Sequence, residues 1–148
     1  MGYDGACEMK QETVDRVLLG ERSEIGAWRS VWTATPGKAR EALGLSHAAG
    51  PDGALALHAD RFGWWFFNRV LGLGLDGPPD LDWLAVQCER YRSAAQPFGV
   101  SIRDAQVAGL APWLGAQQLN HSSTLAKLIR TVDRLPVPTG DLRIRQVG

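Results

Sequence analysis

Apolar residues in the first part of the chain recur at the spacing of one helical face. Between Gln11 and Thr35 they follow one another at steps of three, four or seven residues, which predicts a helix. Glycine costs about 1 kcal/mol relative to alanine inside a helix, so we expect a break or bend between Gly20 and Gly26. The apolar positions of this face are Val14, Val17, Leu18, Ile25, Trp28 and Trp32.

A second, short helix is predicted over Lys38–Leu43. Thr35 followed by Pro36 is typical of a cap with proline at the first helical position, and Gly44 is placed to end the helix. Residues Ser46–Gly53 are small and rich in turn formers, so they predict neither a helix nor a strand.

Two apolar runs then predict an antiparallel hairpin. Ala54–Ala59 and Trp64–Leu75 are separated by a short segment, Asp60–Gly63, whose length suits a hairpin loop. With a period of two residues, both faces of the second run are largely apolar. Strands covered on both faces belong to sheets with helices on each side, so we expect that architecture, with Trp64 and Trp65 in the core.

The clearest helix follows a turn rich in proline and aspartate. Asp80 is a candidate N-cap, since its carboxylate can accept a hydrogen bond from a free N–H group of the first turn. Pro97 is expected to end this helix. Its apolar stripe consists of Leu81, Leu84, Ala85, Cys88, Tyr91 and Ala95.

The remaining pattern predicts three short elements. Val100 and Ile102 indicate a strand, Pro112–Leu119 a helix and Ser123–Val132 another strand. A strand pair followed by helix, strand, helix and strand is the outline of a mixed α/β sandwich, an α/β (α+β) fold.

The length of 148 residues fits one domain, which we assign to residues 1–134. Residues 135–140 contain two prolines and are typical of a linker. Leu142–Val147 alternates like a strand. We interpret residues 135–148 as a linker and a candidate first strand of a second domain; the pattern equally fits an edge strand that returns to the same sheet.

The charge balance removes several function classes. Sixteen Lys and Arg match sixteen Asp and Glu, so the basic excess typical of proteins that bind nucleic acids or anionic membranes is missing. No run reaches the ~18–20 apolar residues of a membrane span, and the first residues lack a signal-peptide pattern. We therefore expect a cytoplasmic protein with no nucleic-acid or membrane partner.

Spacing alone identifies no metal or catalytic group. Cys7 and Cys88 have no CxxC partner, so we interpret Cys88 as a small buried apolar residue and Cys7 as a thiol of a loose N-terminus, with a long-range disulfide between them as the alternative. The spacing of His47, His58 and His121 matches no metal site, and neither G-x-S-x-G nor the P-loop motif occurs. We expect no metal site, and the catalytic residues stay unknown.

One short pattern carries binding chemistry. R-x-x-G-x-G stands at the end of the predicted second strand of the hairpin, ahead of the strongest helix. Bare glycines where a strand gives way to a helix expose main-chain N–H groups and a positive dipole end, an arrangement that receives phosphates. The six residues are Arg69, Val70, Leu71, Gly72, Leu73 and Gly74.

The segment Phe67–Leu75, with the proline-containing turn and the helix from Asp80 that follow it, resembles the GNAT superfamily of acyl-CoA-dependent N-acetyltransferases. It is most similar to the N-terminal halves of bacterial tandem proteins that carry two such folds. The resemblance implies a mixed, mostly antiparallel sheet, splayed open near its centre, with helices on both faces. Acyl-CoA would lie with its pantetheine against the central strand and its pyrophosphate on the loop beyond.

Carried over to this chain, the resemblance implies that acetyl-CoA is held by Arg69 and by the main chain of Leu71, Gly72, Leu73 and Gly74. Two positions depart from the family pattern. Leu75–Pro79 separate the glycines from the helix, and Leu114 stands where the family often has a tyrosine that serves as general acid. A leucine cannot donate a proton.

Three functions follow as hypotheses. The first is transfer of an acetyl group from acetyl-CoA to an unidentified small-molecule or peptide amine. The second is a non-catalytic GNAT-like module that packs against a second catalytic domain, a partner or another copy of itself. The third is a small-molecule binding protein with a hydrophobic pocket formed by Trp64, Trp65 and Phe67.

Overall fold

The computed structural model describes residues 4–127, and side chains from residue 13 onward. Its centre is a four-stranded mixed sheet in the order β1-β2-β3-β4. The first three strands are antiparallel and β4 runs parallel to β3, which confirms the expected mixed, mostly antiparallel sheet of an α+β fold. The strands are β1 (Leu45–Ala49), β2 (Leu55–Ala59), β3 (Arg69–Leu71) and β4 (Gly99–Val100).

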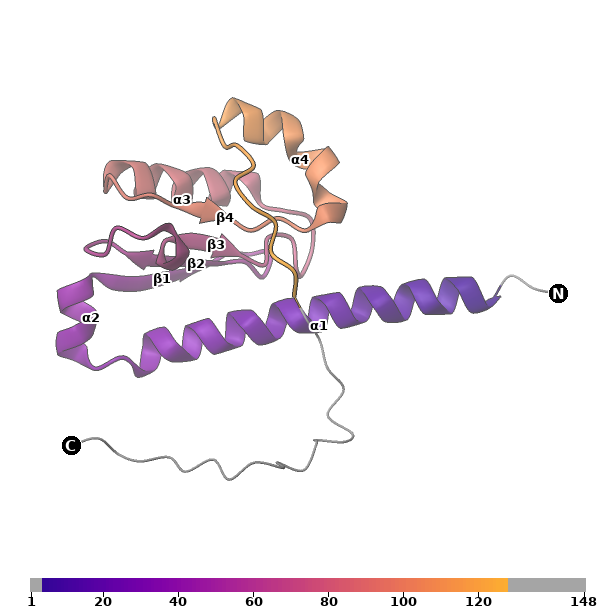
Figure 1. Cartoon of the computed structure of the whole chain (residues 1–148), viewed down its shortest axis with the longest axis horizontal. Coiled ribbons are helices and arrows are strands. Elements are labelled where there is room, and N and C mark those ends of the chain that lie inside the picture. Colours follow the sequence, from indigo (N-terminus) through magenta and orange to yellow (C-terminus); the bar gives the residue numbers. More distant parts are fainter. Residues whose placement is uncertain (1–3, 128–148) are drawn as a thin grey trace, which may run out of the picture.

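Helices cover both faces of the sheet, as expected (Figure 1). One face carries α1 (Asp4–Ala34), which α2 (Gly37–Leu43) links to β1, and the other carries α3 (Leu81–Ser93) and α4 (Asp104–Ala116). Alternation along the strands divides the core in two. The α1 side contains Ile25, Trp32, Leu55, Leu57, Leu71 and Leu75, and the α3 side contains Ala54, Ala56, Val70, Leu73, Leu84, Cys88, Tyr91 and Leu110.

Helix α1 is continuous over 31 residues, so the expected break between Gly20 and Gly26 is wrong. Two residues of its inner face, Ile25 and Trp32, are buried against the sheet. Packing of this stripe outweighs the roughly 1 kcal/mol that each glycine costs the helix.

The short helix predicted over Lys38–Leu43 is confirmed as α2, which begins one residue earlier, at Gly37. Pro36 is the N-cap of α2 and not its first helical residue, while Gly44 ends the helix at φ +65°, a left-handed conformation that favours glycine. Strand β1 lies mostly within the segment that predicted no element. Its pairing with β2, Ala48 opposite Ala56, supplies the hydrogen bonds that its local sequence does not signal.

The strand predicted over Trp64–Leu75 is wrong over most of its length. Only Arg69–Leu71 is a strand, and Trp65–Phe67 forms one turn of 3-10 helix. The buried side chain of Asn68 explains the difference, because it accepts a hydrogen bond from the Ala59 N–H (2.8 Å) and donates to the Phe62 carbonyl (3.1 Å). These bonds replace a longer strand ladder beside β2.

The second half of the chain differs mainly in the position of one helix. Asp80 caps α3 as predicted, with its Oδ1 accepting from the Trp83 N–H at 2.8 Å. Helix α4 begins eight residues earlier than expected and contains Pro112 in its interior. Residues 123–127 form no strand; the rest of that predicted strand, and residues 135–148, lie outside the described residues.

Candidate functional site

Arg69, expected to contact the cofactor, points from β3 toward α1. Its side chain is 3% exposed, and its Nη2 donates to Glu24 Oε1 at 3.1 Å. The guanidinium also lies over the rings of Trp28 and Phe66, at 5.1 and 4.2 Å from their centroids. Burial lowers the pKa of Arg69, and the Glu24 carboxylate opposes that shift. Arg69 therefore joins α1 to the sheet and does not face the glycine loop.

The two leucines of the expected cofactor path are core residues. Leu71 packs in the α1 half of the core and Leu73 in the α3 half, each 1% exposed. Gly72 adopts φ +66°, and a Cβ there would collide with the Ile25 side chain. Helix α1 thus covers the main chain of Gly72.

The glycine loop encloses a carboxylate of the protein itself. Asp52, only 4% exposed, accepts at Oδ2 from the N–H groups of Gly74 (2.7 Å) and Asp80 (3.2 Å). Its Oδ1 accepts from the Ala54 N–H at 3.2 Å, and its carbonyl accepts from the Asp76 N–H at 2.8 Å. The anion that these amides bind is thus the side chain of Asp52, and Gly74 is the one residue of the R-x-x-G-x-G pattern among the donors.

The opening between β3 and β4 is occupied by side chains. The parallel pair ends where the Ser101 N–H donates to the Val70 carbonyl at 2.9 Å. Beyond it, Arg103 Nη2 donates to the carbonyls of Leu73 (3.2 Å) and Gly74 (2.8 Å), and Gln106 Nε2 donates to Leu73 (2.9 Å). The carbonyls of Gly72, Leu73 and Gly74 and the N–H of Gly74 therefore already have partners.

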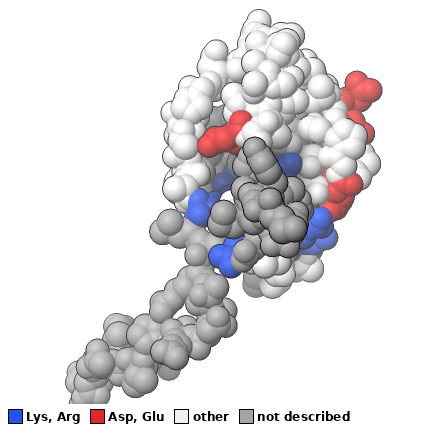
Figure 2. Space-filling model, turned by 90° about the vertical axis from the view of Figure 1, so that its right-hand side faces the viewer, with Lys and Arg blue, Asp and Glu red and all other residues white. Residues whose placement is uncertain are grey.

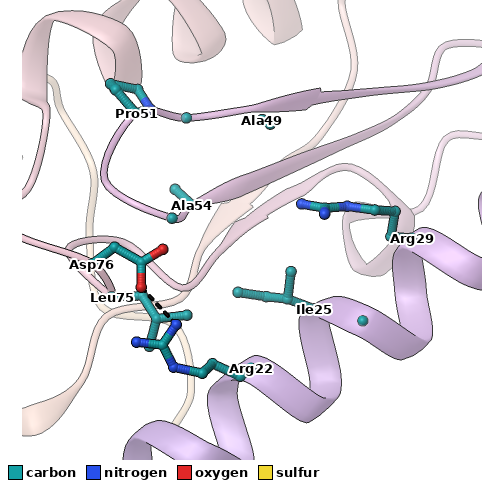
Figure 3. Close-up of a pocket in the computed structure, with 11 residues that line it drawn as sticks. Arg22, Ile25, Arg29, Ala49, Pro51, Ala54, Leu75 and Asp76 are labelled. Atoms are coloured by element: carbon teal, nitrogen blue, oxygen red, sulfur yellow. Dashed lines mark ion pairs between the residues drawn. The ribbon is translucent and has the colours of Figure 1, made fainter.

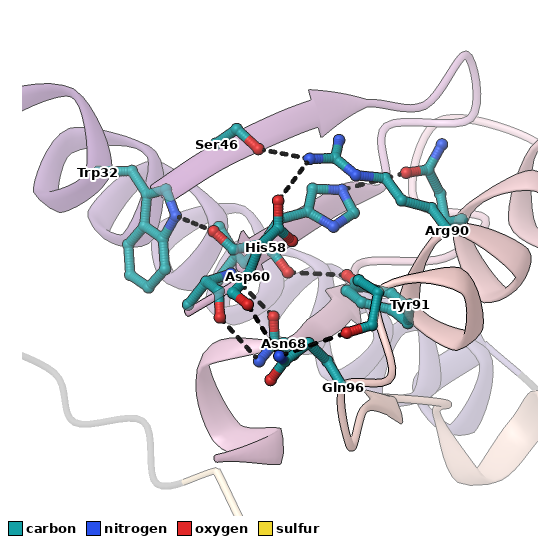
Figure 4. Close-up of polar contacts among 12 residues, drawn as sticks. Trp32, Ser46, His58, Asp60, Asn68, Arg90, Tyr91 and Gln96 are labelled. Carbon is teal, nitrogen blue, oxygen red and sulfur yellow. Dashed lines mark hydrogen bonds and ion pairs between the residues drawn. The ribbon is translucent and has the colours of Figure 1, made fainter. Parts of the chain in front are cut away.

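A buried polar cluster lies between β2 and α3 (Figure 4). His58 Nε2 meets Gln87 Oε1 at 3.2 Å, and the Tyr91 hydroxyl donates to the Leu57 carbonyl at 2.8 Å. Burial, with the nearby Arg90 guanidinium, lowers the pKa of His58 to about 4, and burial raises the pKa of Tyr91. Both groups are fully buried, so the cluster is suited to joining α3 to the sheet.

The other chemistry-bearing residues are also structural or solvated. Leu114 packs against the α3 half of the core, and Cys88 is fully buried, which raises the pKa of its thiol. Glu41 and Glu89 are exposed on α2 and α3. Within residues 4–127, no group of three or more His, Cys, Asp or Glu side chains is arranged to hold a metal ion.

The expectation that Trp64 and Trp65 are core residues is wrong. They are 51% and 37% exposed, and Phe62 beside them is 41% exposed. The 3-10 turn carries these rings outward, where a strand would have directed alternate rings into the core. We call Phe62, Trp64 and Trp65 the aromatic face. A groove of about 240 Å³ adjoins it, lined by Val31, Trp32, Thr35, Leu43, Leu45, Ala59, Phe62 and Phe67.

Figure 2 shows the end of the molecule at the right of Figure 1, where acidic and basic side chains both occur. None of the helices described is long and apolar enough to cross a membrane. Comparison with known proteins matched no family, no curated protein and no solved structure.

Proposed function

We propose that this chain is a non-catalytic, GNAT-like module that packs through its aromatic face against a partner protein domain. The observation that carries the proposal is the carboxylate of Asp52 inside the glycine loop. It occupies the N–H groups of Gly74 and Asp80, which a pyrophosphate would need.

Both halves of the expected cofactor path weigh against acyl-CoA binding. A phosphate approaching the loop meets a buried negative charge, and like charges repel strongly where water is excluded. Along the pantetheine path, Arg103 and Gln106 hold the carbonyls of Leu73 and Gly74. Leu114 supplies no general acid.

The aromatic face supports the packing role. Tryptophan is enriched among the residues that dominate binding energy at protein interfaces. The exposed rings of Phe62 and Trp64 lie with their centroids 6.5 Å apart, and the exposed Trp65 follows them along the chain. The groove lined by Phe62 is almost wholly apolar, so an apolar side chain of a partner fits it. Without another partner, a second copy of the chain is expected to cover this face, giving self-association.

Two measurements on the full chain test the proposal. Isothermal titration with acetyl-CoA and CoA should give no binding heat at millimolar ligand. Sedimentation velocity should show association that grows with protein concentration. The double variant Trp64→Ser, Trp65→Ser should be monomeric, whereas Val86→Ser, which removes an apolar side chain 64% exposed on α3, should associate like the parent.

A second candidate is acetyl-CoA-dependent N-acetyl transfer to an amine. One observation favours it: β3 and β4 are parallel for only two residue pairs, as in a sheet that opens near its centre. Saturable heat with acetyl-CoA from a monomeric protein would select this function and overturn the packing proposal.

A further inference from the structure

A second depression lies between α1 and the β1-β2 turn (Figure 3). It has a volume of about 350 Å³, within the size of small-molecule sites. Ile25 and Leu75, which are 6% and 7% exposed, contribute its apolar lining, and more than half of the exposed lining is polar. No residue of the aromatic face or of the Gly72–Gly74 loop lines it.

Of the three charged side chains that line this pocket, Arg29 is the one without an opposite charge beside it, and the neighbouring Asp52 carboxylate is bonded to main-chain N–H groups. Arg22 and Asp76 form an ion pair at 2.6 Å. Arg29 extends over the pocket in Figure 3, and its guanidinium forms no hydrogen bond or ion pair within residues 13–127. A ligand with one negative charge completes the balance, and the planar guanidinium fork matches a carboxylate.

Gly26 provides a second, independent observation. Arg22, Gly26 and Arg29 are spaced at i, i+4 and i+7 and so share one face of α1. A Cβ at Gly26 would meet no heavy atom within 4 Å, so packing does not require glycine there, although glycine weakens a helix interior. The missing side chain keeps the space between the two arginines open.

We propose that this pocket binds a small organic monoanion, with its carboxylate on Arg29 and its apolar body on Ile25 and Leu75. The site is separate from the proposed packing surface and does not depend on it. Binding requires both the Arg29 guanidinium and the open space above Gly26.

Titration of the full chain with 4-phenylbutyrate, followed by amide resonances, tests the site. Saturable shifts should centre on Gly26, Gly50 and Gly53. The neutral 4-phenylbutyramide and inorganic phosphate should each bind at least about tenfold more weakly, since one lacks the charge and the other the apolar body. Phosphate binding as well as phenylbutyrate would overturn the assignment to an organic anion.

Variants separate binding from folding. Arg29→Ala should weaken phenylbutyrate binding about tenfold, whereas Lys38→Ala, which removes an exposed cation on α2, should not. Gly26→Leu should abolish binding while the melting temperature stays equal or rises. Ala27→Leu places the same side chain at the next, exposed position and should bind like the parent. Equal binding by Gly26→Leu and Ala27→Leu, or no shifts in the parent, would overturn the proposal.

Discussion

At the scale of single residues, Asp52 does the most to define the site. Its carboxylate joins three main-chain segments, at Ala54, Gly74 and Asp80. Local rules identify Asp80 as a cap and Gly44 as a helix end, because both act on neighbouring residues. They do not identify Asp52, because two of its partners lie 22 and 28 residues away.

Replacing Asp52 should therefore lower the free energy of unfolding of the protein. Asp52→Ala leaves buried N–H groups without acceptors, and we expect a loss of about 2–4 kcal/mol in the free energy of unfolding. Urea denaturation measures this loss. Asp82→Ala, at an exposed position in the first turn of α3, is the control and should cost less than about 1 kcal/mol. Equal losses would show that the loop does not depend on Asp52.

His58 should make stability depend on pH. Its folded pKa of about 4 lies below the unfolded value of 6.5, so the unfolded chain binds the extra proton first. The contribution of neutral His58 to the free energy of unfolding is fully present above pH 6.5. It decreases as the pH falls from 6.5 toward 4, by about 3 kcal/mol in total.

Chemical denaturation at several pH values checks the expectation for His58. The variant His58→Gln should lose most of this slope, whatever its stability at pH 7. His47→Gln, which removes an exposed histidine on β1, should keep the slope. A slope retained by His58→Gln would assign it to other groups.

At the scale of elements, the sequence pattern predicts whether a segment is a helix or a strand better than it predicts where that element begins and ends. The helices α2 and α3 and strand β2 follow from apolar spacing and caps. The run Trp64–Leu75 misleads because an aromatic, apolar stretch fits a turn packed on α1 as well as a strand. Helix α1 stays continuous through Gly20 and Gly26 because ionic contacts add to the packing of its apolar stripe. In these contacts Glu24 pairs with Arg69 and with Lys127.

Removing the partner of Arg69 should loosen α1. In Glu24→Ala the buried guanidinium keeps its charge without a carboxylate, and we expect a loss of about 2–3 kcal/mol. Arg22→Ala breaks the ion pair of α1 with Asp76, in which both side chains are about half exposed, and should cost about 1 kcal/mol or less. Thermal and urea unfolding compare the two variants. A Glu24→Ala loss no larger than that of Arg22→Ala would mean that Arg69 does not need the ion pair.

At the scale of the whole molecule, the α+β class and the covering of both sheet faces could be predicted, although the run from which the covering was argued is a strand only at Arg69–Leu71. The contents of the candidate site could not. R-x-x-G-x-G predicts main-chain amides that receive a phosphate, whereas the one amide of the motif that binds an anion, that of Gly74, binds the side chain of Asp52. The pocket at Arg29 is lined by α1 and by the turns around Gly50 and Asp76, which lie more than 20 residues away in the sequence, so no local motif predicts it.

The ionic contact between Lys127 and Glu21 spans 106 residues and bears on how the chain is made. Translation delivers α1 first, whereas β3 and then Lys127 leave the ribosome much later. Trp28 and Trp32 of α1 therefore stay exposed to solvent until the sheet that they pack against has been synthesised. The salt bridge from Glu21 to Lys127 forms only after residue 127 has left the ribosome. This interval is the stage at which a chaperone would find the growing polypeptide most accessible.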